Sequence, residues 1–112
     1  MKVKIEKLGE KEIMKTLDTL YTAASAVTGR DAVKLFLKDL LTSSERIMLG
    51  RRIIIARMLL SGETYDGITK RLKVGHDTIF RVQRWLNDQM PGYEKAIAGL
   101  EREFDKRPVP EF

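Results

Sequence analysis

The side chains best suited to binding chemistry in this 112-residue chain lie between positions 64 and 88. From position 76 onward, one face of a predicted helix combines cationic, anionic and aromatic groups: His76, Asp77, Phe80, Arg81 and Arg84. In the major groove of DNA, arginine forks onto guanine, aspartate accepts from cytosine, and an apolar ring packs on the thymine methyl group. We therefore interpret these five residues as base-reading candidates.

Four of these candidates also have a purely structural interpretation. His76 could be an ordinary surface residue, and Asp77 could act on the positive helix N-terminus. Phe80 could be tucked into the core. Arg84 could pair with Asp88, four residues further along the helix.

A second group of polar side chains precedes the first and suits the DNA backbone: Thr64, Tyr65, Lys70 and Lys73. Contacts to phosphates position a protein on DNA without reading its sequence. The segment 51–86 holds eight Lys and Arg against three Asp and Glu, which equals the net charge of +5 of the whole chain. Such a local surplus favours a polyanion as partner, although a solvated basic surface is the alternative.

Other classes of function find little support. The chain has no cysteine and one histidine, which removes thiol nucleophiles, disulfides and clustered metal ligands. We find no nucleophile–base pair and no phosphate-binding glycine loop, so we expect neither an enzyme nor a bound cofactor. No apolar run approaches the roughly 20 residues of a membrane span, and the N-terminus lacks the apolar region of a secretory signal. We expect a cytoplasmic protein.

These side chains must be positioned by helices, because the chain has a helix-forming composition and no proline before Pro91. The periodicity predicts an all-α fold of about six helices: 11–27, 31–41, 42–61, 64–72, 76–88 and 91–104. A capping box at Thr42–Glu45 starts the third helix, and Gly62 stops it. The short helices around the turn 73–75 form a helix-turn-helix over about 64–88. We predict one domain over residues 1–105 and an extended tail over 106–112.

The third predicted helix indicates a dimer. Between Ile53 and Leu60 it is apolar nearly all round, and such a helix is buried on every side. A chain of this length can rarely enclose it alone, so we expect a second copy to cover it. In the helix that follows the turn, the inward residues are Ile79, Val82, Trp85 and Leu86, and we expect Trp85 in the core.

Residues 30–100 resemble the Trp repressor superfamily. The segments Leu40–Arg46, Leu49–Arg52 and Leu59–Glu63 are similar to the middle of the Trp repressor. Three further segments are more similar to the Trp repressor-related proteins of the YerC/YecD type: Ala56–Leu59, Gly62–Tyr65 and Thr78–Leu86. The resemblance implies an intertwined, all-helical homodimer that regulates transcription through two recognition helices on double-stranded DNA.

The resemblance also implies a vestigial ligand pocket. Arg52 and Arg81 match the two arginines that flank tryptophan in the Trp repressor, and Thr78 matches a pocket threonine. Val82 and Trp85 stand where that family has small residues, and we expect their bulk to fill the space of an indole ring. A tryptophan corepressor is therefore not expected. Arg52 needs a partner or a solvent-facing position, because it lies within an apolar helix.

Together these features predict a sequence-specific, double-stranded DNA-binding transcriptional regulator. We interpret it as a repressor that acts as a homodimer without tryptophan. The alternative is a helical dimer that serves as a protein-interaction module, with the helix-turn-helix retained as a scaffold.

Overall fold

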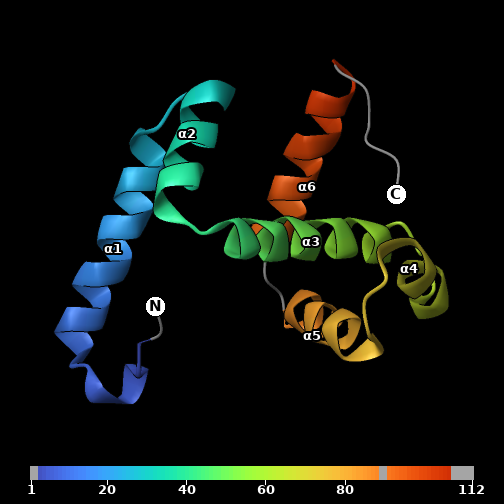
Figure 1. Ribbon diagram of the computed structural model, residues 1–112, viewed down its shortest axis with the longest axis horizontal. Coiled ribbons are helices and arrows are strands. Elements are labelled where there is room, and N and C mark those ends of the chain that lie inside the picture. The colour runs from blue at the N-terminus through green and yellow to red at the C-terminus, as the bar shows by residue number, and fades with distance from the viewer. Residues whose placement is uncertain (1–2, 89–90, 107–112) are drawn as a thin grey trace. The chain divides into compact units, whose positions relative to one another are not determined.

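The computed structural model describes residues 3–88 and 91–106, and within this part the chain is helical without any strand. Along the described chain a short 3-10 helix precedes six α-helices: η1 (Ile5–Lys7), α1 (Glu10–Ala26), α2 (Arg30–Leu40), α3 (Ser43–Leu60), α4 (Tyr65–Leu72), α5 (His76–Asn87) and α6 (Pro91–Phe104). Figure 1 labels the α-helices on the ribbon. The predicted all-α class and its six helices are confirmed, with boundaries that differ by about one residue. None of the described helices is both long and apolar enough to cross a bilayer.

Helix α3 begins at the predicted capping box. The Thr42 hydroxyl accepts from the Glu45 amide at 3.1 Å, and the Glu45 carboxylate accepts from the Thr42 amide at 2.8 Å. The backbone hydrogen bond from Thr42, with a smaller contribution from its side chain, lowers the pKa of Glu45. At the other end, Gly62 has a φ of 87°, a left-handed conformation that glycine adopts without a steric cost.

The helix-turn-helix forms as the sequence predicts. The Thr64 hydroxyl caps α4 by accepting from the Gly67 amide at 3.1 Å. Helix α4 ends at Lys73, which takes a left-handed conformation with φ 54° and ψ 45°. Val74 is buried in the core and so fixes the turn, and Gly75 precedes α5 without a side-chain cap.

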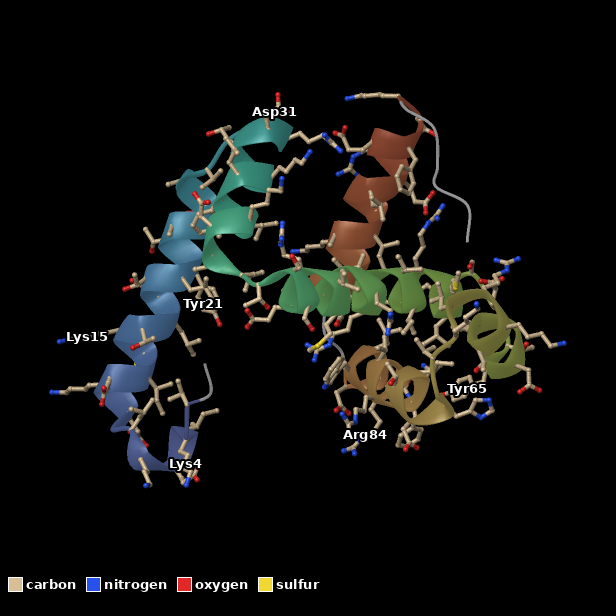
Figure 2. All side chains as sticks on the ribbon, in the orientation of Figure 1. Lys4, Lys15, Tyr21, Asp31, Tyr65 and Arg84 are labelled. Carbon is tan, nitrogen blue, oxygen red and sulfur yellow. The ribbon has the colours of Figure 1, made fainter. Side chains whose placement is uncertain are left out.

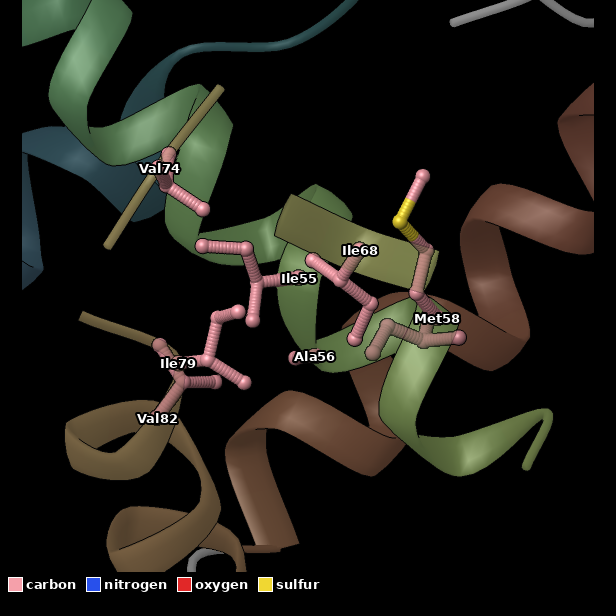
Figure 3. Packing of buried hydrophobic residues seen from close by; sticks show 8 residues of the cluster. Ile55, Ala56, Met58, Ile68, Val74, Ile79 and Val82 are labelled. Carbon is pink, nitrogen blue, oxygen red and sulfur yellow. The ribbon is translucent and has the colours of Figure 1, made fainter. Parts of the chain in front are cut away.

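The chain divides into two compact units, residues 1–46 and residues 47–112. The second unit holds the buried core, shown in Figure 3, with residues from α3, α4, the turn, α5 and α6: Ile55, Ala56, Met58, Ile68, Val74, Ile79, Val82 and Ile97. Burying one large aliphatic side chain contributes about 1.5–3 kcal/mol. Ile79 and Val82 are completely buried, so this core is what fixes α5 in the unit.

The first unit has no buried residue among its described positions, 3–46. Large apolar side chains lie exposed along α1 and α2: Met14, Leu17, Leu20, Tyr21, Val33, Leu35, Leu37 and Leu40. The apolar band of α3 is only partly enclosed by the chain itself. Ile55 and Ala56 are fully buried, whereas Ile53 is 38% and Leu60 47% exposed.

Two predictions about organisation stay open. That residues 1–105 form one domain remains a prediction. The predicted extended tail, 106–112, lies outside the described residues except for Lys106.

Candidate nucleic-acid interface

Helix α5 exposes one polar face and buries the other. All five base-reading candidates are exposed: His76, Asp77, Phe80, Arg81 and Arg84. Their spacing places them on one side of the helix. On the other side Ile79 and Val82 are fully buried. Figure 2 shows Arg84 projecting away from α3.

Two of the structural alternatives for these residues are wrong. Phe80 is not in the core, because 53% of it is exposed. Arg84 does not pair with Asp88, because the ion pairs of residues 3–88 and 91–106 join other side chains: Arg57–Glu101, Arg71–Glu63 and His76–Asp66. Both Phe80 and Arg84 are therefore available to a partner of α5.

His76 is held by the neighbouring helix, a contact that the sequence analysis missed. Its Nε2 lies 3.2 Å from a carboxylate oxygen of Asp66 on α4, and the pair is an ion pair only when the imidazole is protonated. The ring also meets Tyr65 edge-on, with 5.8 Å between the ring centroids. Both polar groups are exposed, so the pair is weak in water, but it orients the imidazole at the start of α5.

The four phosphate candidates have different surroundings. Lys70 and Lys73 are exposed at the end of α4. Thr64 is exposed as well, and its hydroxyl, which accepts from the Gly67 amide, keeps its own proton to donate. Tyr65 is half-buried and packs against the core, so only its hydroxyl is suited to a contact with a DNA phosphate.

A hollow of about 200 Å³ lies between α3 and α5, lined by Met48, Arg51, Arg52, Thr78, Arg81, Val82 and Trp85. It brings together all five residues of the expected vestigial pocket. However, Val82 and Trp85 form walls of the hollow and do not close it. Two lining residues, Met48 and Arg51, were missed. Helical spacing offers a signal for both, because Met48 precedes Arg52 by four residues and Arg51 by three on α3.

Trp85 is half-buried beside the core, at the end of α5, rather than inside the core. The Arg52 guanidinium carbon lies 5.1 Å from the centre of its ring. Tyr93 of α6 stacks on Trp85 with 6.5 Å between the ring centroids and 12° between the planes. Arg52 thus has the partner that its apolar helix requires, since the face of an indole attracts a cation.

Comparison with known proteins agrees with this architecture. The family model of the Trp repressor protein matches residues 15–101. The chain belongs to the Trp repressor family. "Uncharacterized protein YerC" of Bacillus subtilis (strain 168) is 35% identical over 95 residues, which are 85% of this chain and 88% of the relative. No solved structure gave a significant match.

The sequence resemblance to the Trp repressor family is thereby confirmed. This is a family of helix-turn-helix DNA-binding regulators rather than of enzymes. The match includes the whole helix-turn-helix, the hollow beside it and the stacked pair of Trp85 and Tyr93.

Proposed function

We propose that this chain is a sequence-specific, double-stranded DNA-binding transcriptional regulator, and that it acts as a homodimer. The exposed face of α5 carries the proposal, because its five candidates share one surface over a buried base of Ile79 and Val82. A recognition helix in the major groove needs both features: side chains free to reach base edges and a rigid core behind them. Membership of the Trp repressor family supports the same function.

The exposed side chains divide into two roles on DNA. Arg81 and Arg84 would fork onto guanines, and Asp77 would accept from a cytosine amino group. Lys70 and Lys73, at the end of α4, would contact phosphates and so set the register of α5.

Unsatisfied apolar surface supports the homodimer. The first unit has no buried residue among positions 3–46, and a segment this short rarely folds without further burial. Exposed leucines on α1 and α2, together with Ile53 on α3, offer that burial to a second copy. A two-fold dimer would present two copies of α5 to half-sites about one helical turn, roughly 34–36 Å, apart.

We also propose repression, tryptophan-independent binding and a cytoplasmic location. A hollow of about 200 Å³ is smaller than the roughly 300–1,000 Å³ of ordinary small-molecule pockets. Val82 and Trp85 stand as its walls, so a ligand larger than the hollow would have to displace packed side chains. Because overpacking a filled site typically costs about 1–3 kcal/mol, we expect a calorimetric titration to show no saturable binding of L-tryptophan at micromolar concentrations.

Selection of binding sites from random double-stranded DNA tests the proposal. We expect one enriched motif with two-fold symmetry. Its affinity should fall with salt at a log–log slope of roughly −5 to −7, if each half of the dimer neutralises three or four phosphates. Binding that ignores sequence and disappears at moderate salt would contradict the proposal and favour the protein-interaction module instead.

A further inference from the structure

The end of α5 is held differently from its beginning. Ile79 and Val82 anchor the first half, because both are completely buried. In the second half, Trp85 and Leu86 are only partly buried and pack against the edge of the core. The hollow lies directly beside Trp85, and Arg52, which lies over the Trp85 ring, lines the same hollow.

The Trp85 ring lies where three helices meet and contacts side chains of the other two. Its own backbone belongs to α5, Arg52 of α3 lies over its ring at 5.1 Å, and Tyr93 of α6 stacks on it. Aromatic stacking and cation–π contacts both depend on geometry, unlike simple burial. The contacts of the ring therefore fix the position of the end of α5, in addition to burying apolar surface.

One base-reading candidate, Arg84, lies at this end of the helix. Arg84 is the neighbour of Trp85 in the chain, and Arg81 lines the same hollow one turn earlier. A displacement of the indole would move the Arg84 guanidinium relative to His76 and Asp77 at the start of α5. Bidentate contacts to a base tolerate little displacement, because both hydrogen bonds require alignment.

We propose that Trp85 is a positioning residue for DNA binding: its stack with Tyr93 and its contact with Arg52 hold the second half of α5 in the register that recognition requires. The proposal rests on the DNA-binding function proposed above. Trp85 itself is not assigned a contact with DNA.

The test compares DNA affinity, fold and ring mobility in matched variants of the full chain. Trp85→Ala removes the ring, and Tyr93→Leu removes its stacking partner from a helix that carries no DNA candidate. We expect about tenfold weaker binding of the selected site for Trp85→Ala, and a smaller loss for Tyr93→Leu, in proportion to the contacts removed. Saturating indole should partly restore the affinity of Trp85→Ala by occupying the enlarged hollow.

Two controls separate positioning from stability. Tyr93→Phe keeps the stacked ring, and Ile97→Val removes one core methyl group from the same helix. We expect both to bind DNA as the wild type does. Because Trp85 is the single tryptophan of the chain, its fluorescence reports the ring directly. Quenching by acrylamide should rise in Tyr93→Leu and stay unchanged in Tyr93→Phe.

The outcomes are distinct. A folded Trp85→Ala with wild-type affinity overturns the proposal, as does Tyr93→Leu with a loosened ring and undiminished binding. If Trp85→Ala does not fold, the DNA affinity of Tyr93→Leu relative to Tyr93→Phe decides whether the stacked ring positions α5. A wild-type chain that binds no DNA would refute the proposed function, and this inference with it. Wild-type binding with unaffected variants would refute this inference alone.

Discussion

At the scale of single residues, replacing Arg84 and replacing Lys70 by alanine should change DNA binding in different ways. Arg84 projects from the exposed face of α5, whereas Lys70 lies at the end of α4. We expect Arg84→Ala to cost about 1–3 kcal/mol on the preferred site and to relax specificity there. Lys70→Ala should weaken all sequences alike and make the salt slope shallower by about two units, one for each half of the dimer. Competition binding with single-base variants of the site measures both, and the reverse pattern would show that the roles are misassigned.

The backbone conformation of Lys73 in the turn is unfavourable for a residue with a side chain. Lys73 has a φ of 54°, and among the described residues the others with a positive φ, Gly29 and Gly62, are glycines. A left-handed conformation costs a non-glycine residue roughly 1–2 kcal/mol. We therefore expect Lys73→Gly to be more stable than Lys73→Ala by about 1 kcal/mol in urea unfolding. Neither variant has the lysine charge, so their comparison isolates the backbone term. Equal stability would mean that the turn relaxes around alanine.

At the scale of elements, the capping box of α3 should make stability depend on pH. The hydrogen bond from the Thr42 backbone lowers the pKa of Glu45 in the folded chain. The contribution of the carboxylate is therefore complete above the pKa of the unfolded chain. It is lost as the pH falls through the lower, folded pKa.

The matching variant is Glu45→Gln, which keeps an acceptor but does not titrate. Wild type should exceed it in free energy of unfolding at neutral pH, and the difference should vanish in acid. Chemical unfolding at a series of pH values provides the measurement. In a Thr42→Ala background the difference should shrink, because the Thr42 side-chain hydrogen bond that also lowers the pKa of Glu45 is lost with the hydroxyl. A difference that persists in acid would contradict this account.

The elements were predictable where their signals are local. Thr42, Gly62 and Thr64 mark helix ends through hydrogen bonds or dihedral angles within a few residues, and the structure has those ends as predicted. The helical period also separates the buried Ile79 from the exposed face of α5.

Other features depend on partners far along the chain. Periodicity leaves Phe80 and Trp85 ambiguous, because an aromatic ring at the edge of an apolar stripe can turn either way. Their burial is decided by what covers them, and for Trp85 this includes Tyr93 on a different helix. The hollow stays open for a related reason. Val82 directs its bulk into the core, and only the packing of α5 on α3 reveals that direction.

At the scale of the whole molecule, the uneven distribution of burial leads to a prediction about assembly. We expect a dimer with no folded monomer at micromolar concentration, because each large side chain covered by a partner contributes about 1.5–3 kcal/mol. Equilibrium sedimentation measures the state directly. As a matched pair, Leu20→Glu should favour dissociation, whereas Lys15→Glu on the same helix should not, since Leu20 is an exposed apolar residue and Lys15 is already polar. A folded monomer in solution would contradict the prediction.

The absence of burial in residues 3–46 also bears on how long a single chain survives. Helices of 17 and 11 residues are marginal in water when little packs on them, so α1 and α2 should open readily in an unassembled chain. Open backbone is the substrate of proteases, and cleavage follows the population of the open form. Chains made in excess of their partners would therefore be degraded from the N-terminal side. Cellular abundance would then depend on the rate at which two chains meet, and a gene expressed below a threshold would yield little active protein.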